Sequence, residues 1–268
     1  MNKSPVAVII PFYKPNLTRL EETAFLQCFK VLSTYPIICL KPQTLTLPEI
    51  THSNDFAKVI SFDDRYFNSI QGYNELMLDS SFYKQLLDYE FILIYQLDAF
   101  VFRDELLFWC EKKFDYVGAP WLRHRDYPDL IKKIKSKFQA YFDIKLNKRI
   151  NGVPTNMQFE NKVGNGGFSL RRVSKFYELS LQYDEKIRHY NTQSDHRYHE
   201  DVFWSIEVNR YKKNLVIPYY KTALKFSFEN SPERSLLLNG GKLPFGCHAW
   251  DKHIAFWSPY FKDQGVDL

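Results

Sequence analysis

The sequence lacks the features that mark a membrane-spanning protein or a cysteine-based metal or redox site. Its four cysteines are spread over 268 residues with no Cys-x-x-Cys pair, so we expect neither a zinc knuckle nor a thioredoxin-type centre. The apolar run at residues 6–10 is too short for the core of a signal peptide or for a membrane span. We therefore expect reduced, mostly buried thiols in a cytoplasmic protein that can contact the inner face of a membrane.

The excess of charge of one sign is small. Thirty-six basic and 31 acidic residues leave a net charge of +5, which is too little to indicate a nucleic-acid partner. With 45% hydrophobic and 25% charged residues, the chain has the composition of a folded globular protein. Its one unusual excess is aromatic, at 17%. Because aromatic faces stack on sugars and bases, this composition permits a carbohydrate or nucleotide site.

Strand and helix patterns alternate over the first hundred residues. A continuous apolar run predicts a strand buried on both faces at residues 6–10. Further strands are predicted at residues 36–40, 58–62 and 91–95, of which the last is the most apolar. Apolar residues at three-to-four spacing predict helices over residues 17–32 and about 72–87. Strands separated by helices favour an α/β fold with a Rossmann-like, mostly parallel central sheet and helices on both faces.

The second half of the chain is less regular. Shorter strands and helices are predicted there, near residues 115–117, 168–171, 173–183 and 201–211. Residues 123–162 are expected to form an insertion, of which residues 131–138 are basic and amphipathic. We find no internal repeat and no low-complexity linker, so we expect a single domain.

Asp98 is the first candidate for chemistry. In open parallel sheets ligands bind beyond the carboxyl ends of the strands, and Asp98 follows the most apolar predicted strand. A carboxylate at that place suits a hard divalent cation that bridges two phosphate groups. The competing interpretation is an aspartate that only caps the following turn.

Three glycines lie within four positions, at Gly164, Gly166 and Gly167. They permit close approach of the backbone to a ligand, or simply a tight hairpin or bulge. The spacing matches neither a dinucleotide fingerprint nor a phosphate-binding P-loop.

Two further candidates follow in the chain. Glu200 and Asp201 are adjacent carboxylates at a predicted helix start, where they are either first-turn acids or a pair that binds and deprotonates an acceptor hydroxyl. His248 lies in a turn between glycine and tryptophan. It is either a packing histidine or one imidazole that completes an oxygen-rich metal site.

Taken in order, these elements resemble the GT-A-fold glycosyltransferases, which use nucleotide sugars. That family has a DxD motif after a buried strand, a glycine-rich loop, an x-Glu-Asp motif and a late histidine. The counterparts are Gln96-Leu97-Asp98, Gly164 to Gly167, His199-Glu200-Asp201 and His248. The stretches 94–100 and 118–121 are also similar to a bacterial family of glycosyltransferases. The resemblance spans nearly the whole chain, with one departure: Gln96 stands at the first acidic position of DxD.

The resemblance implies one glycosyltransferase domain over residues 1–268, with a donor half at about 5–102 and an acceptor half at about 103–268. It implies transfer from a nucleoside-diphosphate sugar, most commonly a UDP-sugar, to a hydroxyl of a saccharide or lipid-linked saccharide in bacterial surface glycan synthesis. Mn²⁺ or Mg²⁺ would be bound by Asp98 and His248. Because Gln96 replaces an acid, only Asp98 of the DxD pair matches as a metal-binding carboxylate.

The resemblance also assigns roles to single residues. Asp201 would take the acceptor proton as the base of an inverting enzyme, and Glu200 would orient the acceptor. Donor contacts are expected from Pro11, Tyr13, Gln96, Asp98, Gly166 and Gly167. Sugar stacking is expected from Trp121 and Trp250, and residues 63–74 are expected to line the donor side, with Asp63, Asp64 and Tyr66 as contacts.

Other functions remain open at this stage. A glycoside hydrolase also needs two carboxylates, with Asp98 and Asp201 as its pair, but it leaves the glycine loop unexplained. A non-catalytic module for nucleotide sugars or glycans would fit the loss of an acid at Gln96. The basic segment 132–148 is either a solvated helix face or a contact with anionic lipid.

Overall fold

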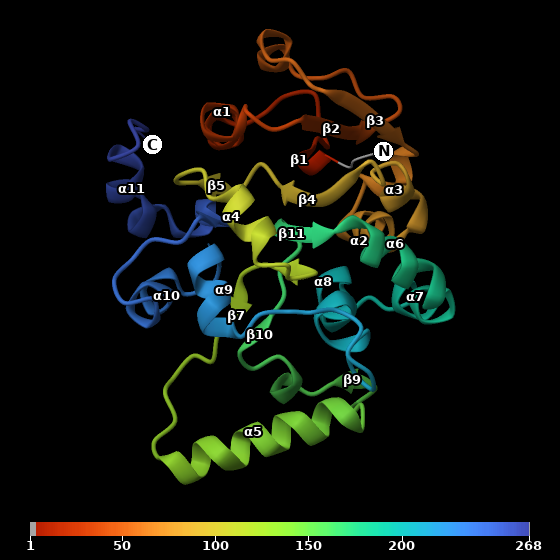
Figure 1. Cartoon of the computed structure of the whole chain (residues 1–268), viewed down its shortest axis with the longest axis vertical. Coiled ribbons are helices and arrows are strands. Elements are labelled where there is room, and N and C mark those ends of the chain that lie inside the picture. Colours follow the sequence, from red (N-terminus) through yellow and green to blue (C-terminus); the bar gives the residue numbers. More distant parts are fainter. Residues whose placement is uncertain (1–3, 268) are drawn as a thin grey trace.

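The computed structural model describes residues 4–267, and a six-stranded sheet runs through its centre (Figure 1). The strand order is β3-β2-β1-β4-β11-β6. These strands span Ser4–Pro11 (β1), Ile37–Pro42 (β2), Lys58–Phe62 (β3), Tyr89–Tyr95 (β4), Tyr116–Val117 (β6) and Phe168–Arg172 (β11). The first four strands pair in parallel, whereas β11 is antiparallel to both of its neighbours. The predicted α/β fold with a mostly parallel sheet is confirmed.

Apolar side chains on both faces of the strands explain why the predicted runs were continuous. Along β1, Val6, Val8 and Ile10 belong to one hydrophobic cluster, and Ala7 and Ile9 belong to another. Successive side chains of a strand point to opposite faces, so each face of this sheet needs its own apolar layer.

Helices cover both faces of the sheet. Helix α1 (Arg19–Leu32) packs on one face, and a capping box between Thr18 and Glu21 fixes its start, a cap that is typically worth about 1 kcal/mol. The other face is covered by α2 (Ile70–Leu78), α3 (Ser80–Lys84), α6 (Val173–Gln182) and α7 (Asp184–Asn191).

A second, smaller sheet lies in the carboxyl half, in the order β12-β13-β5. Its strands are Phe100–Val101 (β5), Ser227–Phe228 (β12) and Gly246–Cys247 (β13). It packs with an aromatic cluster that contains Phe102, Trp257 and Phe261. The helices around it are α9 (Tyr220–Phe226), α10 (Pro232–Leu238) and α11 (Ile254–Lys262), whereas α4 (Leu106–Glu111) packs on the main sheet on the same side as α1.

The insertion forms a long helix, α5 (Leu130–Lys145), at the edge of the molecule, drawn in green in Figure 1. Short paired strands flank it, namely β7 (Pro120–Trp121) with β10 (Lys162–Val163) and β8 (Arg149–Ile150) with β9 (Val153–Pro154). The predicted amphipathic helix is therefore present. None of the helices in the described range is both long and apolar enough to cross a membrane.

Two predicted helices differ from those observed. The helix expected over about 72–87 divides into α2 and α3 because Asp79 is extended and its side chain caps α3. The helix expected over 201–211 is much shorter. It consists of α8 (Glu200–Val202) and a π-helical turn, Phe203–Glu207, closed by the bond from the Val208 N–H to the Phe203 carbonyl.

Candidate active site

A cavity of about 900 Å³ opens beyond the carboxyl ends of β1 and β4, where the fold predicts a ligand site. It gathers most of the residues singled out from the sequence. Those in its wall are Tyr13, Gln96, Asp98, Gly166, Gly167, Glu200, Asp201, His248 and Trp250. The segment from Phe67 to Asn74 contributes to the same wall, as expected for residues 63–74.

Asp98 and His248 meet in this cavity. Asp98 Oδ1 lies 3.1 Å from His248 Nε2, and Gln96 Oε1 lies at the same distance from that nitrogen. Burial by itself lowers the pKa of His248, but the carboxylates of Asp98 and Glu229 raise it to about 10. Burial by itself raises the pKa of Asp98, and the nearby imidazolium more than offsets this and lowers it. In the absence of another cation, a proton on His248 offsets one of the two negative charges that Asp98 and Glu229 bring to this cluster.

Glu229 is a site residue that sequence reasoning missed. Its Oε1 lies 3.3 Å from His248 Nδ1, and the Asn165 side-chain nitrogen lies 3.0 Å from the same atom. The pairing of β12 with β13 explains this, since Phe228 is in register with Cys247 and the next residues of both strands are Glu229 and His248. Only the strand register could have revealed this neighbour.

These residues fit a divalent cation that is also bound by a substrate. Among residues 4–267, no group of three His, Cys, Asp or Glu is arranged to hold a metal. Asp98 and His248 nevertheless offer one carboxylate and one imidazole, with the amide oxygen of Gln96 beside them. Magnesium-type ions are commonly held by one or two protein ligands plus substrate phosphates. A carboxylate on the far nitrogen, here Glu229, orients a ligating imidazole.

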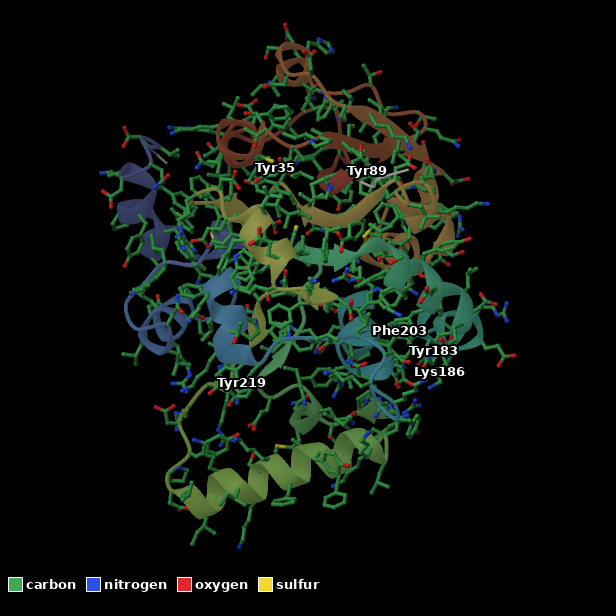
Figure 2. All side chains as sticks on the ribbon, in the orientation of Figure 1. Tyr35, Tyr89, Tyr183, Lys186, Phe203 and Tyr219 are labelled. Carbon is green, nitrogen blue, oxygen red and sulfur yellow. The ribbon has the colours of Figure 1, made fainter. Side chains whose placement is uncertain are left out.

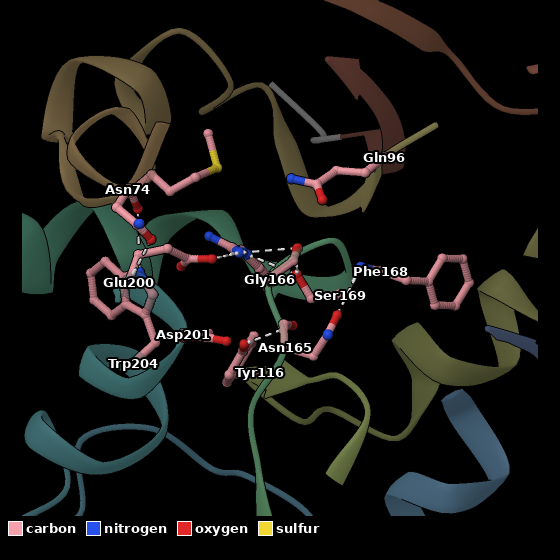
Figure 3. A network of polar contacts seen from close by, with 12 residues as sticks. Asn74, Gln96, Tyr116, Asn165, Gly166, Phe168, Ser169, Glu200, Asp201 and Trp204 are labelled. Carbon is pink, nitrogen blue, oxygen red and sulfur yellow. Dashed lines mark hydrogen bonds and ion pairs between the residues drawn. The ribbon is translucent and has the colours of Figure 1, made fainter. Parts of the chain in front are cut away.

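On the other side of the cavity lies the Glu200 network (Figure 3). Glu200 Oε1 accepts a hydrogen bond from the fully buried Arg171 guanidinium at 2.9 Å. Arg171 also donates to Tyr83 and to Ser169. The backbone N–H of Glu200 donates to the Asn74 side chain at 2.9 Å. Within the described residues, Glu200 Oε2 is buried without a hydrogen-bond partner, so this oxygen is free to accept a bond from a ligand.

Asp201 lies next to this network, with Oδ1 accepting from the Val202 N–H at 2.8 Å. Burial disfavours its charged form, and the carboxylates of Glu200 and Glu229 add like charge. Together they raise the pKa of Asp201 from 3.8 to about 8. A carboxylate with a proton affinity in this range is suited to take a proton near neutral pH.

The glycine loop lies between the two groups, and it is glycine-rich because side chains press against its backbone. A Cβ atom on Gly166 would overlap the Glu200 carboxylate, and one on Gly167 would overlap the His248 ring. Gly164 is likewise covered by the Trp121 ring. The close approach to the glycine backbone that was expected of a ligand is therefore made by side chains of the protein itself.

Several predicted contacts lie elsewhere. Pro11 ends β1 and is not in the cavity wall, although Tyr13 two residues later is. Trp121 lines a separate cavity of about 470 Å³ together with Phe159. Trp250 borders the main cavity, but its side chain is 0% exposed and its Nε1–H donates to the Ala99 carbonyl. Sugar stacking by the two tryptophans stays a prediction.

The expected contacts at the start of the 63–74 segment are also engaged with protein. Asp63 caps the 3₁₀ turn Asp64–Tyr66, Asp64 pairs with Thr44, and Tyr66 donates to Asp79. None of the three lines the main cavity; each is bonded to another part of the protein instead.

A family model described as "Protein of unknown function (DUF5672)" matches residues 56–248, more than half of the chain. The chain belongs to the DUF5672 family. The matched region includes Gln96, Asp98, Glu200, Asp201 and His248. No curated protein matches the chain.

Several solved sugar transferases have a similar chain trace. The galactosyltransferase LgtC, in a complex with donor and acceptor sugar analogues, is 13% identical with a TM-score of 0.49, over 90% of this chain and 86% of that one. Core-mannan synthase A from Aspergillus fumigatus, in a Mn/GDP form, is 13% identical with a TM-score of 0.49. The match covers 82% of this chain and 73% of that one. The mannosyltransferase Ktr4p from S. cerevisiae is 12% identical with a TM-score of 0.47. The match covers 82% of this chain and 69% of that one. Identities and TM-scores this low describe a similar chain trace only, so the function has to be argued from the residues of the cavity.

Proposed function

We propose that this DUF5672 member is a glycosyltransferase that moves a sugar from a nucleoside-diphosphate sugar to an acceptor hydroxyl. One observation carries the proposal. Asp98 and His248, which would hold a cation, share one cavity with the carboxylate pair Glu200 and Asp201, and the Gly166–Gly167 backbone lies between the two pairs. This arrangement would place the diphosphate of the donor beside Asp98 and His248 and the acceptor hydroxyl beside Glu200 and Asp201, with the reacting carbon between them.

At the donor end, Asp98, His248 and Gln96 would hold Mn²⁺ or Mg²⁺ together with the diphosphate. When bound, such an ion neutralises the negative charge of the departing nucleoside diphosphate. The cavity of about 900 Å³ is large enough for a nucleotide sugar. We propose a UDP-sugar as the donor, because the resembling family uses UDP-sugars most commonly.

At the acceptor end, Asp201 would take the proton of the attacking hydroxyl. The new bond joins that oxygen to the anomeric carbon as the bond from this carbon to the diphosphate oxygen breaks, through an oxocarbenium-like transition state. The partnerless Oε2 of Glu200 would accept a hydrogen bond from the acceptor. Attack opposite the leaving group inverts the anomeric centre. The acceptor's identity and a role in bacterial surface glycan synthesis stay predictions from the resemblance.

The test is release of nucleoside diphosphate from a panel of nucleotide sugars with Mn²⁺ and saccharide acceptors. We expect turnover by the wild type, and a loss of about a hundredfold or more for Asp201→Asn. Asp88→Asn, at an exposed position, makes the same chemical change outside the cavity and should leave turnover unchanged. Binding of nucleotide sugar without turnover would favour a binding module, and sugar release from a glycan without nucleotide would favour a hydrolase.

The stereochemistry has its own test. The anomeric configuration of the product, read by proton NMR, should be opposite to that of the donor. A product with the donor's configuration would overturn the role given to Asp201 while leaving donor binding by Asp98 and His248 intact.

A further inference from the structure

The outward face of α5 is apolar, which reverses the usual arrangement of a surface helix. The side of the helix that faces the body makes polar contacts: Ser136 donates to Glu160 at 3.1 Å, and Asp143, seven residues later, accepts from Thr155 at 2.6 Å. The exposed apolar side chains are Leu130, Ile131, Ile134, Phe138, Tyr141, Phe142 and Leu146. A helix that only faced water would carry polar residues on that side.

These apolar residues form one continuous stripe. Ile131, Ile134, Phe138 and Phe142 follow one another at three- and four-residue spacing, and are 67%, 46%, 62% and 54% exposed. Residues at this spacing share a helix face. Figure 2 shows side chains of the green helix extending away from the body of the protein. A contiguous exposed apolar surface of this kind marks an interaction site.

Basic residues surround the stripe. Residues 130–150 contain seven basic side chains and a single acidic one, Asp143, a net charge of +6 that exceeds the +5 of the whole chain. Asp143 is buried, so the exposed surface of the segment carries basic charge alone. Lys132, Lys135 and Lys137 are exposed, and none of them forms an ion pair within residues 4–267.

We propose that α5 lies on the surface of an anionic lipid bilayer. Helices with an apolar face and flanking lysines lie in the plane of the headgroups, with the apolar face buried among the acyl chains. Each lysine or arginine near such a surface adds electrostatic attraction. A second copy of the chain is a poorer occupant, because two such faces would bring +6 against +6. This inference does not depend on the transferase activity.

The experiment is sedimentation with vesicles of phosphatidylcholine alone, or of phosphatidylcholine and phosphatidylglycerol in equal parts. We expect the full chain to bind the anionic vesicles at least about tenfold better than the neutral ones, and added salt to weaken the binding. The double variant Ile134→Ser with Phe138→Ser should lose about tenfold or more in binding. Leu237→Ser, at an even more exposed apolar position on α10, should bind like the wild type.

Each outcome decides the proposal. All substituted side chains are exposed, so thermal unfolding of the variants should match that of the wild type, which separates lost binding from lost folding. Absence of binding to anionic vesicles, or equal binding by the double variant, would overturn the lipid surface as the partner. A concentration-dependent dimer that the double variant abolishes, measured by sedimentation velocity without lipid, would assign the face to a second copy instead.

Discussion

Replacing Asp201 by asparagine should make the protein relatively more stable as the pH rises. The pKa of Asp201 is raised to about 8 because burial disfavours the charge, and because Glu200 and Glu229 repel it more than Arg171 and the Val202 N–H attract it. At pH values between the pKa of Asp201 in the unfolded chain and its pKa in the folded protein, the folded protein holds a proton on Asp201 that the unfolded chain releases. Stability is therefore lost as the pH rises through this window. The asparagine variant lacks this titration, so it escapes the loss.

The magnitude follows from the same shift. Each tenfold change in proton affinity is worth about 1.4 kcal/mol, so a rise from 3.8 to about 8 sets an upper bound of about 6 kcal/mol. Asp201 is only partly buried by surface area, and its titration is coupled to that of Glu200. We therefore expect the stability difference between variant and wild type to grow by about 2 to 3 kcal/mol between about pH 5 and pH 9.

Urea unfolding followed by tryptophan fluorescence measures this difference, since Trp204 and Trp250 are fully buried. The matched control is Asp88→Asn, which makes the same change at an exposed position and should show a far smaller slope against pH. A difference for Asp201→Asn that stays flat, or that falls with rising pH, would refute the reasoning. The carboxylate would then be charged in the folded protein at neutral pH.

Three further substitutions probe the cavity wall and the buried arginine behind it. Gly167→Ala should cost about 1 to 3 kcal/mol in unfolding free energy, because its Cβ overlaps the His248 ring; unchanged stability and cation binding would contradict this packing. Glu229→Gln should weaken binding of Mn²⁺ with nucleotide about tenfold or more, measured by calorimetry, because it removes the charge beside His248 Nδ1; unchanged affinity would deny it a positioning role. Arg171→Met should destabilise by about 3 to 5 kcal/mol at neutral pH, because it leaves Glu200 buried without its cation. A small loss of stability at neutral pH, or a loss that stays the same in acid, would contradict this.

The sheet could be predicted because β1, β2 and β4 are buried on both faces and therefore read as apolar runs. The edge strand β3 buries only alternate residues. The position of Asp98 at the carboxyl ends of the parallel strands could be predicted from the same runs, because Asp98 follows the run at residues 91–95. The early end of the helix expected over 201–211 could not be predicted from the sequence, because the residues of the π-helical turn after Val202 pack against the distant helices α2 and α6.

The site was predicted in part. Asp98, Glu200 and Asp201, which line the cavity, could be singled out because each follows or opens a recognisable element. His248 could be singled out because it matches the late histidine of the resembling family. Glu229 was missed because its position beside His248 arises from the pairing of two-residue strands, which have no periodic pattern to detect. The outward apolar face of α5 was ambiguous for a related reason: periodicity gives the two faces of a helix but does not say which one meets the body.

Binding of nucleoside diphosphates with and without Mn²⁺ tests the central claim most directly. Calorimetry should show that UDP, or another member of a panel of diphosphates, binds only with the cation, and that Asp98→Asn weakens this binding at least about tenfold. Asp88→Asn should bind as the wild type does. If no diphosphate binds under either condition, or if binding is the same without Asp98, the cavity is not a metal-dependent nucleotide-sugar site.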